Sequence, residues 1–345
     1  MKVMVATNAV PFVRGGAELL ADRLVSQLRD RGHEAGLLRI PFRFDSPAEV
    51  EDAMFYASSV ELRGVDRVIA MKFPAYLIRH DSMVVWLLHQ FRQVYDLWQT
   101  PWGPPADDPD WVALRQAVSI ADQGAMGGAR RVFANDSVTR DRLRTHNALD
   151  AAILYPPLPD VIEPSRQPLG DYLLCLGRVS GGKRTELAVE AMLHTTSAVR
   201  LVVAGAPDNP DLAERLRALA ARPELADRVD LRLRFVDTDE KRRLLEGACG
   251  VVYLPVDEDS FGYVTAEAMS AGRPVVTARD SGGVLNLVRH ESTGLVCNPE
   301  PGALGAAYDE VYGSPARSER WGRAAAAAVA SLGLSWDHVI AELLG

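Results

Sequence analysis

Apolar runs alternate with polar, often glycine-containing segments along the whole chain. Runs of about 4–8 residues that are rich in β-branched side chains predict buried strands. They occur at residues 2–6, 35–40, 67–70, 83–88, 131–134, 172–176, 200–205, 229–235, 251–255 and 274–278. Between the first two runs, Leu20, Leu24 and Leu28 recur at helical spacing, and Gly32 ends the predicted helix 19–31. This alternation predicts parallel, doubly wound α/β sheets, whose ligands bind at the carboxyl ends of the strands.

Two domains are expected from the length of 345 residues, because each half is long enough to bury its own core. Residues 156–170 are rich in proline and polar side chains, as an interdomain linker would be. We therefore divide the chain into a first domain of residues 1–162, a second of residues 163–328 and a C-terminal segment of residues 329–345. In that segment, Ser335 predicts the N-cap of a final helix.

The net charge of −8 argues against a nucleic-acid partner, because binding to a phosphate backbone requires clustered Lys and Arg that outweigh the acids. The chain opens without the charged and apolar regions of a secretory signal, and no uncharged apolar run approaches transmembrane length. We therefore expect a cytoplasmic protein. The pairs Arg29/Arg31 and Arg130/Arg131 are compatible with peripheral contact at the inner face of a membrane, although solvated helix ends explain them more simply.

The three cysteines are far apart in the sequence, and each lies in or beside an apolar run: Cys175, Cys249 and Cys297. This pattern fits neither a disulfide framework nor a metal-binding knuckle. We interpret the cysteines as buried structural thiols.

The segment 251–283 carries the main candidate for a site. A predicted strand stops there at an acidic loop, and a short predicted helix follows from about Gly262 to Gly272. The first N–H groups of that helix lack intrahelical partners and carry the positive end of the helix dipole, so they favour phosphate. Asp259 and Glu267 flank the helix start, and carboxylates bind sugar hydroxyls rather than phosphate. A ligand that carries phosphate between two sets of hydroxyls is a nucleotide sugar.

This segment resembles the E-x7-E region of retaining glycosyltransferases of family four, which have the GT-B fold. The resemblance rests on Asp259-x7-Glu267 within DSFGYVTAEAMSAGRPVV, followed by Ser281-Gly282-Gly283 and by ESTGLV at residues 291–296. It implies an α/β GT-B fold with two doubly wound Rossmann-like domains and an interdomain cleft. The first domain would bind the acceptor and the second the nucleotide sugar, and the C-terminal helix would cross back to the first domain. The family usually has Glu at the first motif position, where this chain has the shorter Asp259.

The resemblance also implies roles for residues outside this segment. The basic, glycine-rich loop 177–183 corresponds to the loop that holds the donor diphosphate, and a second glycine pair follows the first strand. The implied catalytic residues are His89, Arg178, Lys183 and Asp259. The implied donor-binding residues are Gly15, Gly16, Arg178, Lys183, Val236, Asp259, Phe261, Gly262, Tyr263, Val264 and Glu267. Of these, Val236 lies in the loop that corresponds to the family's base-contacting segment. A histidine directly after an apolar strand is otherwise often structural, and surface charges on a turn would explain the cations of the loop.

Aromatic residues gather just past His89, on a proline-rich stretch that contains Phe91, Tyr95, Trp98 and Trp102. They suit an acceptor-binding platform for the flat face of a sugar. A loop packed by its own side chains explains them equally well.

The resemblance implies a retaining transfer of sugar from a nucleotide-diphosphate sugar to a hydroxyl acceptor, which would be a glycan, a lipid-linked glycan or a small-molecule natural product. The nucleotide sugar is then a co-substrate, and we expect no cofactor and no metal. Three alternatives stay open. Asp257-Glu258-Asp259 fits a D-x-D metal motif of another glycosyltransferase fold, although its context differs. A nucleotide-sugar epimerase would share the architecture, and a non-catalytic nucleotide-sugar-binding protein or inactive partner subunit would explain the shortened Asp259.

Overall fold

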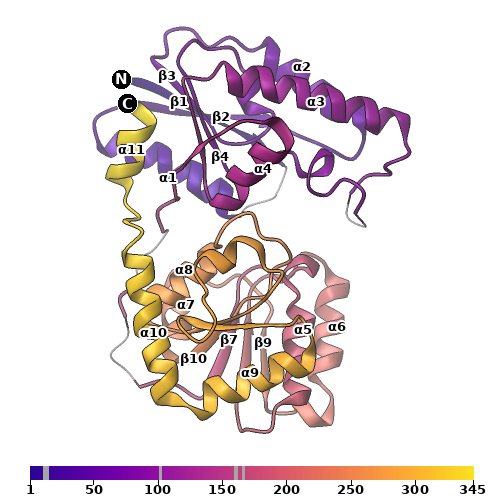
Figure 1. The fold of residues 1–345 in the computed structure, drawn as a ribbon, viewed down its shortest axis with the longest axis vertical. Helices are drawn as coiled ribbons and strands as arrows, with labels where there is room; N and C mark the ends of the chain where they lie inside the picture. Colours follow the sequence, from indigo (N-terminus) through magenta and orange to yellow (C-terminus); the bar gives the residue numbers. More distant parts are fainter. Residues whose placement is uncertain (11–14, 101–102, 159–161, 165–167) are drawn as a thin grey trace. The chain divides into compact units, whose positions relative to one another are not determined.

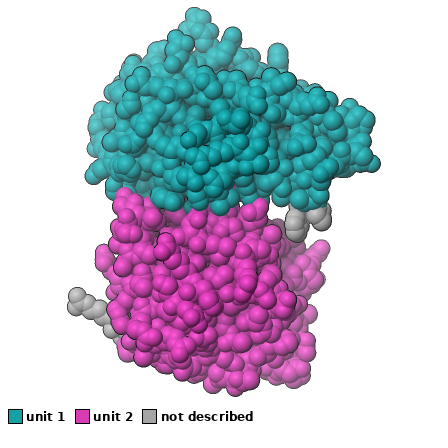
Figure 2. Space-filling model, in the orientation of Figure 1, with its two compact units in different colours: residues 1–157, 335–345 teal, residues 158–334 magenta. Residues whose placement is uncertain are grey.

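The computed structural model of the chain describes residues 1–10, 15–100, 103–158, 162–164 and 168–345. These residues form two compact units, each with its own sheet and core (Figures 1 and 2). The first unit comprises Met1–Pro157 and Ser335–Gly345, and the second comprises Leu158–Leu334. The chain therefore changes unit after Pro157, somewhat earlier than the boundary placed at residue 162. Its last helix belongs to the first unit.

The first unit is built around a six-stranded parallel sheet of order β2-β1-β3-β4-β5-β6 (Figure 1). Its strands are β1 (Lys2–Ala9), β2 (Glu34–Pro41), β3 (Arg67–Ala70), β4 (Met83–Leu87), β5 (Arg131–Ala134) and β6 (Ala152–Ile153). Its α-helices are α1 (Gly16–Asp30), α2 (Pro47–Ser59), α3 (Pro109–Gly127), α4 (Ser137–Asn147) and α11 (Trp336–Leu344). Two single 3-10 turns are η1 (Ala75–Leu77) and η2 (Arg92–Val94).

Alternate residues of β4 face opposite sides of this sheet, as the two-residue period of a strand requires. Val84 and Trp86 pack with residues of α1 and α11, whereas Val85 and Leu87 pack with residues of α2 and α3. Helices therefore cover both faces of the sheet, which confirms the doubly wound arrangement predicted from the sequence (Figure 1).

Helix α11 is held to this unit by apolar contacts and by arginines. Val339, Ile340 and Leu343 are buried in the same core cluster as α1. Arg31 donates to Asp337 at 3.0 Å and Arg131 donates to Glu342 at 2.7 Å. The other members of the arginine pairs also contact this unit, since Arg29 donates to Ala35 O and Arg130 donates to Gly345 O, both at 2.9 Å. These contacts give the four arginines a structural use that requires no membrane.

The second unit has a parallel six-stranded sheet of order β12-β11-β10-β7-β8-β9. Its strands are β7 (Tyr172–Leu176), β8 (Arg200–Ala204), β9 (Val229–Arg232), β10 (Ala248–Val252), β11 (Val275–Ala278) and β12 (Gly294–Cys297). Its α-helices are α5 (Thr185–Glu190), α6 (Pro210–Ala220), α7 (Thr238–Gly247), α8 (Tyr263–Ser270), α9 (Pro301–Gly313) and α10 (Pro315–Ala330). The 3-10 turns are η3 (Gly181–Lys183), η4 (Ala191–His194), η5 (Pro223–Leu225) and η6 (Gly282–Asn286).

The strand order of the second unit reverses between β7 and β10. In open parallel sheets, ligands bind outside the carboxyl ends of the two strands at such a point, because the following loops diverge there. The loops that follow β7 and β10 are the glycine-rich basic loop 177–183 and the acidic loop 253–262. The topology therefore brings the two segments singled out in the sequence to the same edge of the sheet.

None of the helices formed by the described residues has the length and apolar character needed to cross a bilayer.

Candidate functional site

Lys183 ends the basic loop that follows β7. Its ammonium donates to the hydroxyl of Tyr253 at 2.9 Å and pairs with the carboxylate of Glu258, and it lies 5.2 Å from the centre of the Tyr253 ring. Both charged side chains are largely buried, with 22% of each exposed. An ammonium has three donors, so Lys183 can share its charge between Glu258 and an anionic ligand.

Arg178 lies on the same loop but is directed differently. Its guanidinium pairs only loosely with Asp208, at 3.5 Å, and 60% of its side chain is exposed. The exposure leaves Arg178 free to turn toward a ligand, at a small energetic cost, because exposed ion pairs contribute little. The backbone before it is tightly packed, since a Cβ on Gly205 would stand 1.7 Å from Gly177 O.

Arg184 joins the loops after β7, β10 and β11, and the sequence analysis missed it. Its guanidinium donates to Leu254 O and Pro255 O, both at 2.8 Å, and makes two hydrogen bonds of 2.8 and 2.6 Å to Asp280. Its backbone has φ of +50°, a left-handed conformation that costs energy for a residue other than glycine. We infer that these hydrogen bonds hold Arg184 in that conformation and thereby fix Lys183 next to it.

The start of helix α8 depends on three glycines. Gly262, the N-cap, has φ of +70°, and a Cβ there would lie 2.9 Å from the ring of Tyr253. A Cβ on Gly282 would stand 2.5 Å from Glu258 N, and one on Gly283 would stand 2.5 Å from Ser260 C. The acidic loop thus lies directly on η6, which explains why Ser281-Gly282-Gly283 accompanies the motif. Gly262 contributes no side-chain cap to α8, and the amino end of this helix follows the loop after β10.

The predicted donor residues around this helix differ in exposure. Phe261 is buried, and Tyr263 and Val264 are partly buried at the first turn of α8. Asp259 is partly exposed in the loop before them. Among the described residues, no group of three His, Cys, Asp or Glu side chains is arranged to hold a metal.

Glu267 lies inside α8 and is almost fully buried, with 4% of its side chain exposed. Its Oε1 accepts from the ammonium of Lys241 on α7 at 2.5 Å. The sequence analysis did not single out Lys241, because the pair joins two helices and has no short-range signal. Val236, predicted to lie near the base, is partly exposed just before α7, and its neighbour Phe235 has 78% of its surface exposed.

In the first unit, the glycine pair begins helix α1. Gly15 N donates to Glu18 Oε2 at 2.8 Å, and Lys72 donates to Glu18 Oε1 at 3.2 Å. The positive charge of Lys72 and the hydrogen bond from Gly15 lower the pKa of Glu18, although burial acts in the opposite direction and is the largest single influence. The predicted phosphate contact of Gly15 and Gly16 therefore competes with a carboxylate that already occupies the helix start.

His89 follows β4 and is partly buried, with its Nδ1 2.7 Å from Gln90 O. Three buried amide side chains lie near the carboxyl ends of β1, β4 and β5: Asn8, Gln90 and Asn135. The side-chain oxygen of each accepts no hydrogen bond from the described residues. Buried amide oxygens usually have partners, so these three are exceptions, but their burial keeps them out of reach of a ligand in this structure.

Behind His89, a buried polar network joins the loop after β4 to helices α3 and α4. Gln90 donates to Asn147, Asn147 donates to the hydroxyl of Tyr95 at 3.0 Å, and Tyr95 donates to Asp122 at 2.8 Å. Tyr76 donates to the other oxygen of Asp122 at 2.9 Å. Burial raises the pKa of Asp122 to about 7, although the two tyrosine hydrogen bonds lower it.

We expect the Asp122→Asn variant to have a stability that depends less on pH than that of the wild type. The pKa of Asp122 rises on folding from 3.8 to about 7, so the folded state binds its proton more tightly. The free energy of unfolding should therefore fall as the pH rises between these values, and the variant should lack this contribution, roughly 1–3 kcal/mol between pH 5 and 7. Urea unfolding at the two pH values measures it. Parallel changes in both proteins would show that Asp122 does not titrate in this range.

The aromatic stretch after His89 is mostly packed inside the first unit. Phe91 is buried and stacks on Phe73 with ring centres 5.2 Å apart, and Tyr95 is buried in the network described above. Trp98 is partly buried beneath Arg115, whose guanidinium lies 5.0 Å from its ring centre. Trp102 lies outside the described residues. Phe91 and Tyr95 thus fit the alternative of a loop packed by its own side chains, and they do not present their faces as a platform.

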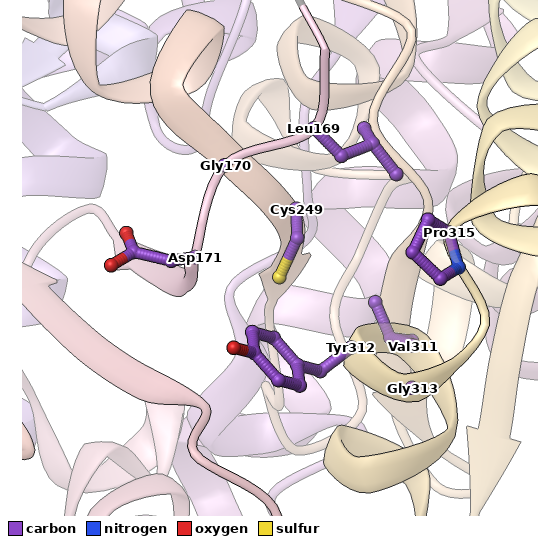
Figure 3. Close-up of a pocket in the computed structure, with 8 residues that line it drawn as sticks. All are labelled: Leu169, Gly170, Asp171, Cys249, Val311, Tyr312, Gly313 and Pro315. Carbon is purple, nitrogen blue, oxygen red and sulfur yellow. The ribbon is translucent and has the colours of Figure 1, made fainter.

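Figure 3 shows a separate cavity in the second unit. Its lining residues place it at the amino ends of the strands, whereas the candidate site lies at their carboxyl ends. Leu169, Asp171, Cys249 and Tyr312 line the cavity, near the amino ends of β7 and β10. Burial raises the pKa of Cys249 to about 12, so that its thiol stays protonated and unreactive. This cavity is remote from the loops that carry Arg178 and Lys183 and is no part of the candidate site.

Comparisons with known proteins agree with the fold and the site. Residues 165–328, most of the second unit, match the family described as glycosyl transferases group 1. The two parallel six-stranded sheets with their helices match solved structures of GT-B glycosyltransferases, so the chain has the GT-B fold. Together, these matches support a glycosyltransferase of the family-four type.

Individual relatives are similar to this chain over most of its length. The D-inositol 3-phosphate glycosyltransferase of Xylanimonas cellulosilytica is 31% identical over 284 residues, which are 77% of this chain and 66% of that protein. The human alpha-1,3/1,6-mannosyltransferase ALG2 is 29% identical over 62% of this chain and 58% of that protein. The chain therefore spans about three fifths to two thirds of these relatives. The structure of Anabaena Alr3699/HepE in complex with UDP is 18% identical, with a TM-score of 0.73 over 100% of this chain and 99% of that chain.

Proposed function

We propose that the chain is a retaining glycosyltransferase that moves a sugar from a nucleoside-diphosphate sugar to a hydroxyl acceptor. The observation that carries this proposal is the gathering of Lys183, the uncapped start of α8 and the buried Glu267 at the carboxyl edge of β7 and β10. Cations and helix amides suit a diphosphate, and a carboxylate suits ribose hydroxyls. The relatives named above, one of them solved with UDP, support the same ligand class.

In the proposed reaction, the bond between the anomeric carbon and the phosphate oxygen breaks, and the leaving diphosphate gains negative charge. Lys183 and the first amides of α8 would stabilise that charge, and Arg178 would join them by turning toward the diphosphate. The acceptor hydroxyl would pass its proton to the leaving phosphate oxygen while its own oxygen bonds to the same face of the sugar, which retains the anomeric configuration. The reaction would need no metal or cofactor, so chelation with EDTA should leave turnover unchanged.

The acceptor would be bound by the first unit, beside His89. The position of His89 supports this assignment, because it follows β4 at the carboxyl edge of the first sheet, where ligands of parallel sheets bind. The departure from the family at Asp259 would act on the donor instead. A carboxylate one methylene shorter would favour a donor sugar whose hydroxyl pattern differs from that of common hexoses.

We expect the His89→Ala variant to bind a nucleoside diphosphate as the wild type does and to transfer sugar at least ~10-fold more slowly, since a side chain beside the reacting sugar acts mainly on the transition state. Calorimetric titration and steady-state rates measure the two quantities. His80→Ala is a matched control, because His80 contacts Val65 O at 3.0 Å on the same unit and lies before β4. Equal losses of affinity and stability in His89→Ala would mark His89 as structural.

A panel of nucleotide sugars with and without hydroxyl acceptors tests the proposed function. Release of nucleoside diphosphate that depends on acceptor, with the anomeric configuration of the product retained in its NMR spectrum, would support it. An epimerised nucleotide sugar formed without acceptor would identify an epimerase instead. Tight donor binding without turnover over the whole panel would favour the non-catalytic alternative.

A further inference from the structure

The ion pair between Lys241 and Glu267 joins two helices that surround the proposed nucleoside position. Glu267 is 4% exposed and Lys241 is 16% exposed, and their closest atoms are 2.5 Å apart. Buried ion pairs add little to stability on average, because desolvation of the charges offsets their attraction. Apolar side chains would pack the same space without this desolvation cost, so packing alone does not explain the pair.

Lys241 is also fixed relative to the segment that was predicted to contact the base. Asp237 is the N-cap of α7 and accepts from Glu240 N at 2.8 Å, and Lys241 N donates to Asp237 O at 2.9 Å. Arg234 makes two hydrogen bonds of 2.7 Å to Glu240. Residues 234–241 therefore form one ordered segment, which contains Val236 and ends at Lys241.

Glu267 has to present ionised oxygens if it is to accept hydrogen bonds from ribose hydroxyls. A buried carboxylate is costly unless it is paired, and Lys241 supplies the opposite charge at Oε1. A carboxylate has about four acceptor sites, so the bond from Lys241 leaves capacity for hydroxyl donors. Lys241 also restricts the rotation of Glu267, because it holds one oxygen at a set position.

We propose that Lys241 is a positioning residue that orients Glu267 toward the ribose and makes the ribose hydroxyls a determinant of donor affinity. Through α7 it links the base-contacting segment and the ribose-binding carboxylate, so that base and ribose are bound by one connected surface. This inference rests on the proposed function, since it needs a nucleoside diphosphate at this edge of the second unit.

Calorimetric titration with a ribonucleoside diphosphate and its 2′,3′-dideoxy analogue tests the proposal. We expect the wild type to bind the ribonucleotide at least ~10-fold more tightly, the range of a hydrogen bond to a charged group. Lys241→Met should weaken the ribonucleotide ~10- to 100-fold and the analogue less than about threefold, so that the preference disappears. Lys241→Arg should restore most of the preference. Arg215→Met, which removes a more exposed partner of Glu186 in the same unit, should change neither affinity.

A second variant separates positioning from folding. Lys241→Met leaves a buried carboxylate without its cation and is expected to unfold at lower temperature, whereas the double variant Lys241→Met/Glu267→Gln should regain stability and still lack the preference for ribose. The inference is overturned if Lys241→Met keeps the preference, if both ligands weaken equally, or if the double variant regains the preference. A wild type that binds both ligands equally also overturns it. A wild type that binds no nucleoside diphosphate contradicts the proposed function and removes the inference with it.

Discussion

Replacement of Lys183 by alanine is expected to lower the turnover of a nucleotide sugar by at least ~10²-fold. The variant removes a donor that is held in place, by Tyr253 and Glu258, at the position assigned to the leaving diphosphate. Removal of one preorganised donor to a developing anion typically costs a factor of about 10²–10³ in rate. The release of nucleoside diphosphate at saturating donor concentration measures the effect.

Two controls decide how the loss arises. Lys2→Ala removes an exposed lysine paired with Glu34 and should leave turnover unchanged. Lys183→Ala also removes the cation that pairs with Glu258 and so leaves the negative charge of Glu258 uncompensated. The double variant Lys183→Ala/Glu258→Gln removes that charge as well. We expect the double variant to be as slow as the single one. Recovery of activity in the double variant, or a loss below threefold in the single one, would remove Lys183 from the site.

Gly262→Ala is expected to reduce activity at least ~10-fold, whereas Gly64→Ala should leave activity intact. The two glycines share a positive φ, +70° and +69°, so an added side chain is strained at both positions. They differ in their surroundings. No atom lies within 4 Å of a Cβ on Gly64, but one on Gly262 meets the Tyr253 ring at 2.9 Å and its hydroxyl at 3.2 Å.

The added methyl group at residue 262 must displace Tyr253 or the start of α8. Tyr253 contacts Lys183, so the displacement reaches the proposed diphosphate position. Thermal unfolding and donor turnover of the two variants, measured side by side, separate strain from displacement. If both variants lost the same stability and kept the same activity, the packing of Gly262 on Tyr253 would have no functional role.

Most strands of both sheets could be predicted from the sequence, because buried parallel strands are short apolar runs with a strong local signal. Strands β6 and β12 were missed. The first contains only Ala152–Ile153, and the second contains a glycine and a cysteine within four residues. The glycine-rich loop and the motif around Gly262 were found for a similar reason, since each is continuous in the sequence.

Contacts between distant segments could not be predicted in the same way. Arg184 reaches Leu254, Pro255 and Asp280, and Lys241 reaches Glu267 on another helix. The local sequence around Arg184 or Lys241 does not distinguish either residue from a charged residue on the solvent-exposed surface. The position of Arg184 directly after the basic loop was the one available signal. The burial of Phe91 and Tyr95 likewise depends on packing against β-strands and helices far away in the chain.

A crystal structure of the protein with the nucleoside diphosphate that it binds most tightly would test whether the nucleotide binds at the carboxyl edge of β7 and β10. We expect electron density for the diphosphate within hydrogen-bonding distance of Lys183 and the first amides of α8, with the ribose hydroxyls at Glu267. Density for the nucleotide elsewhere, for example in the cavity beside Cys249, would contradict the proposed site. A nucleotide bound in the opposite orientation, with its base at Lys183, would contradict the proposed roles of Lys183 and Glu267.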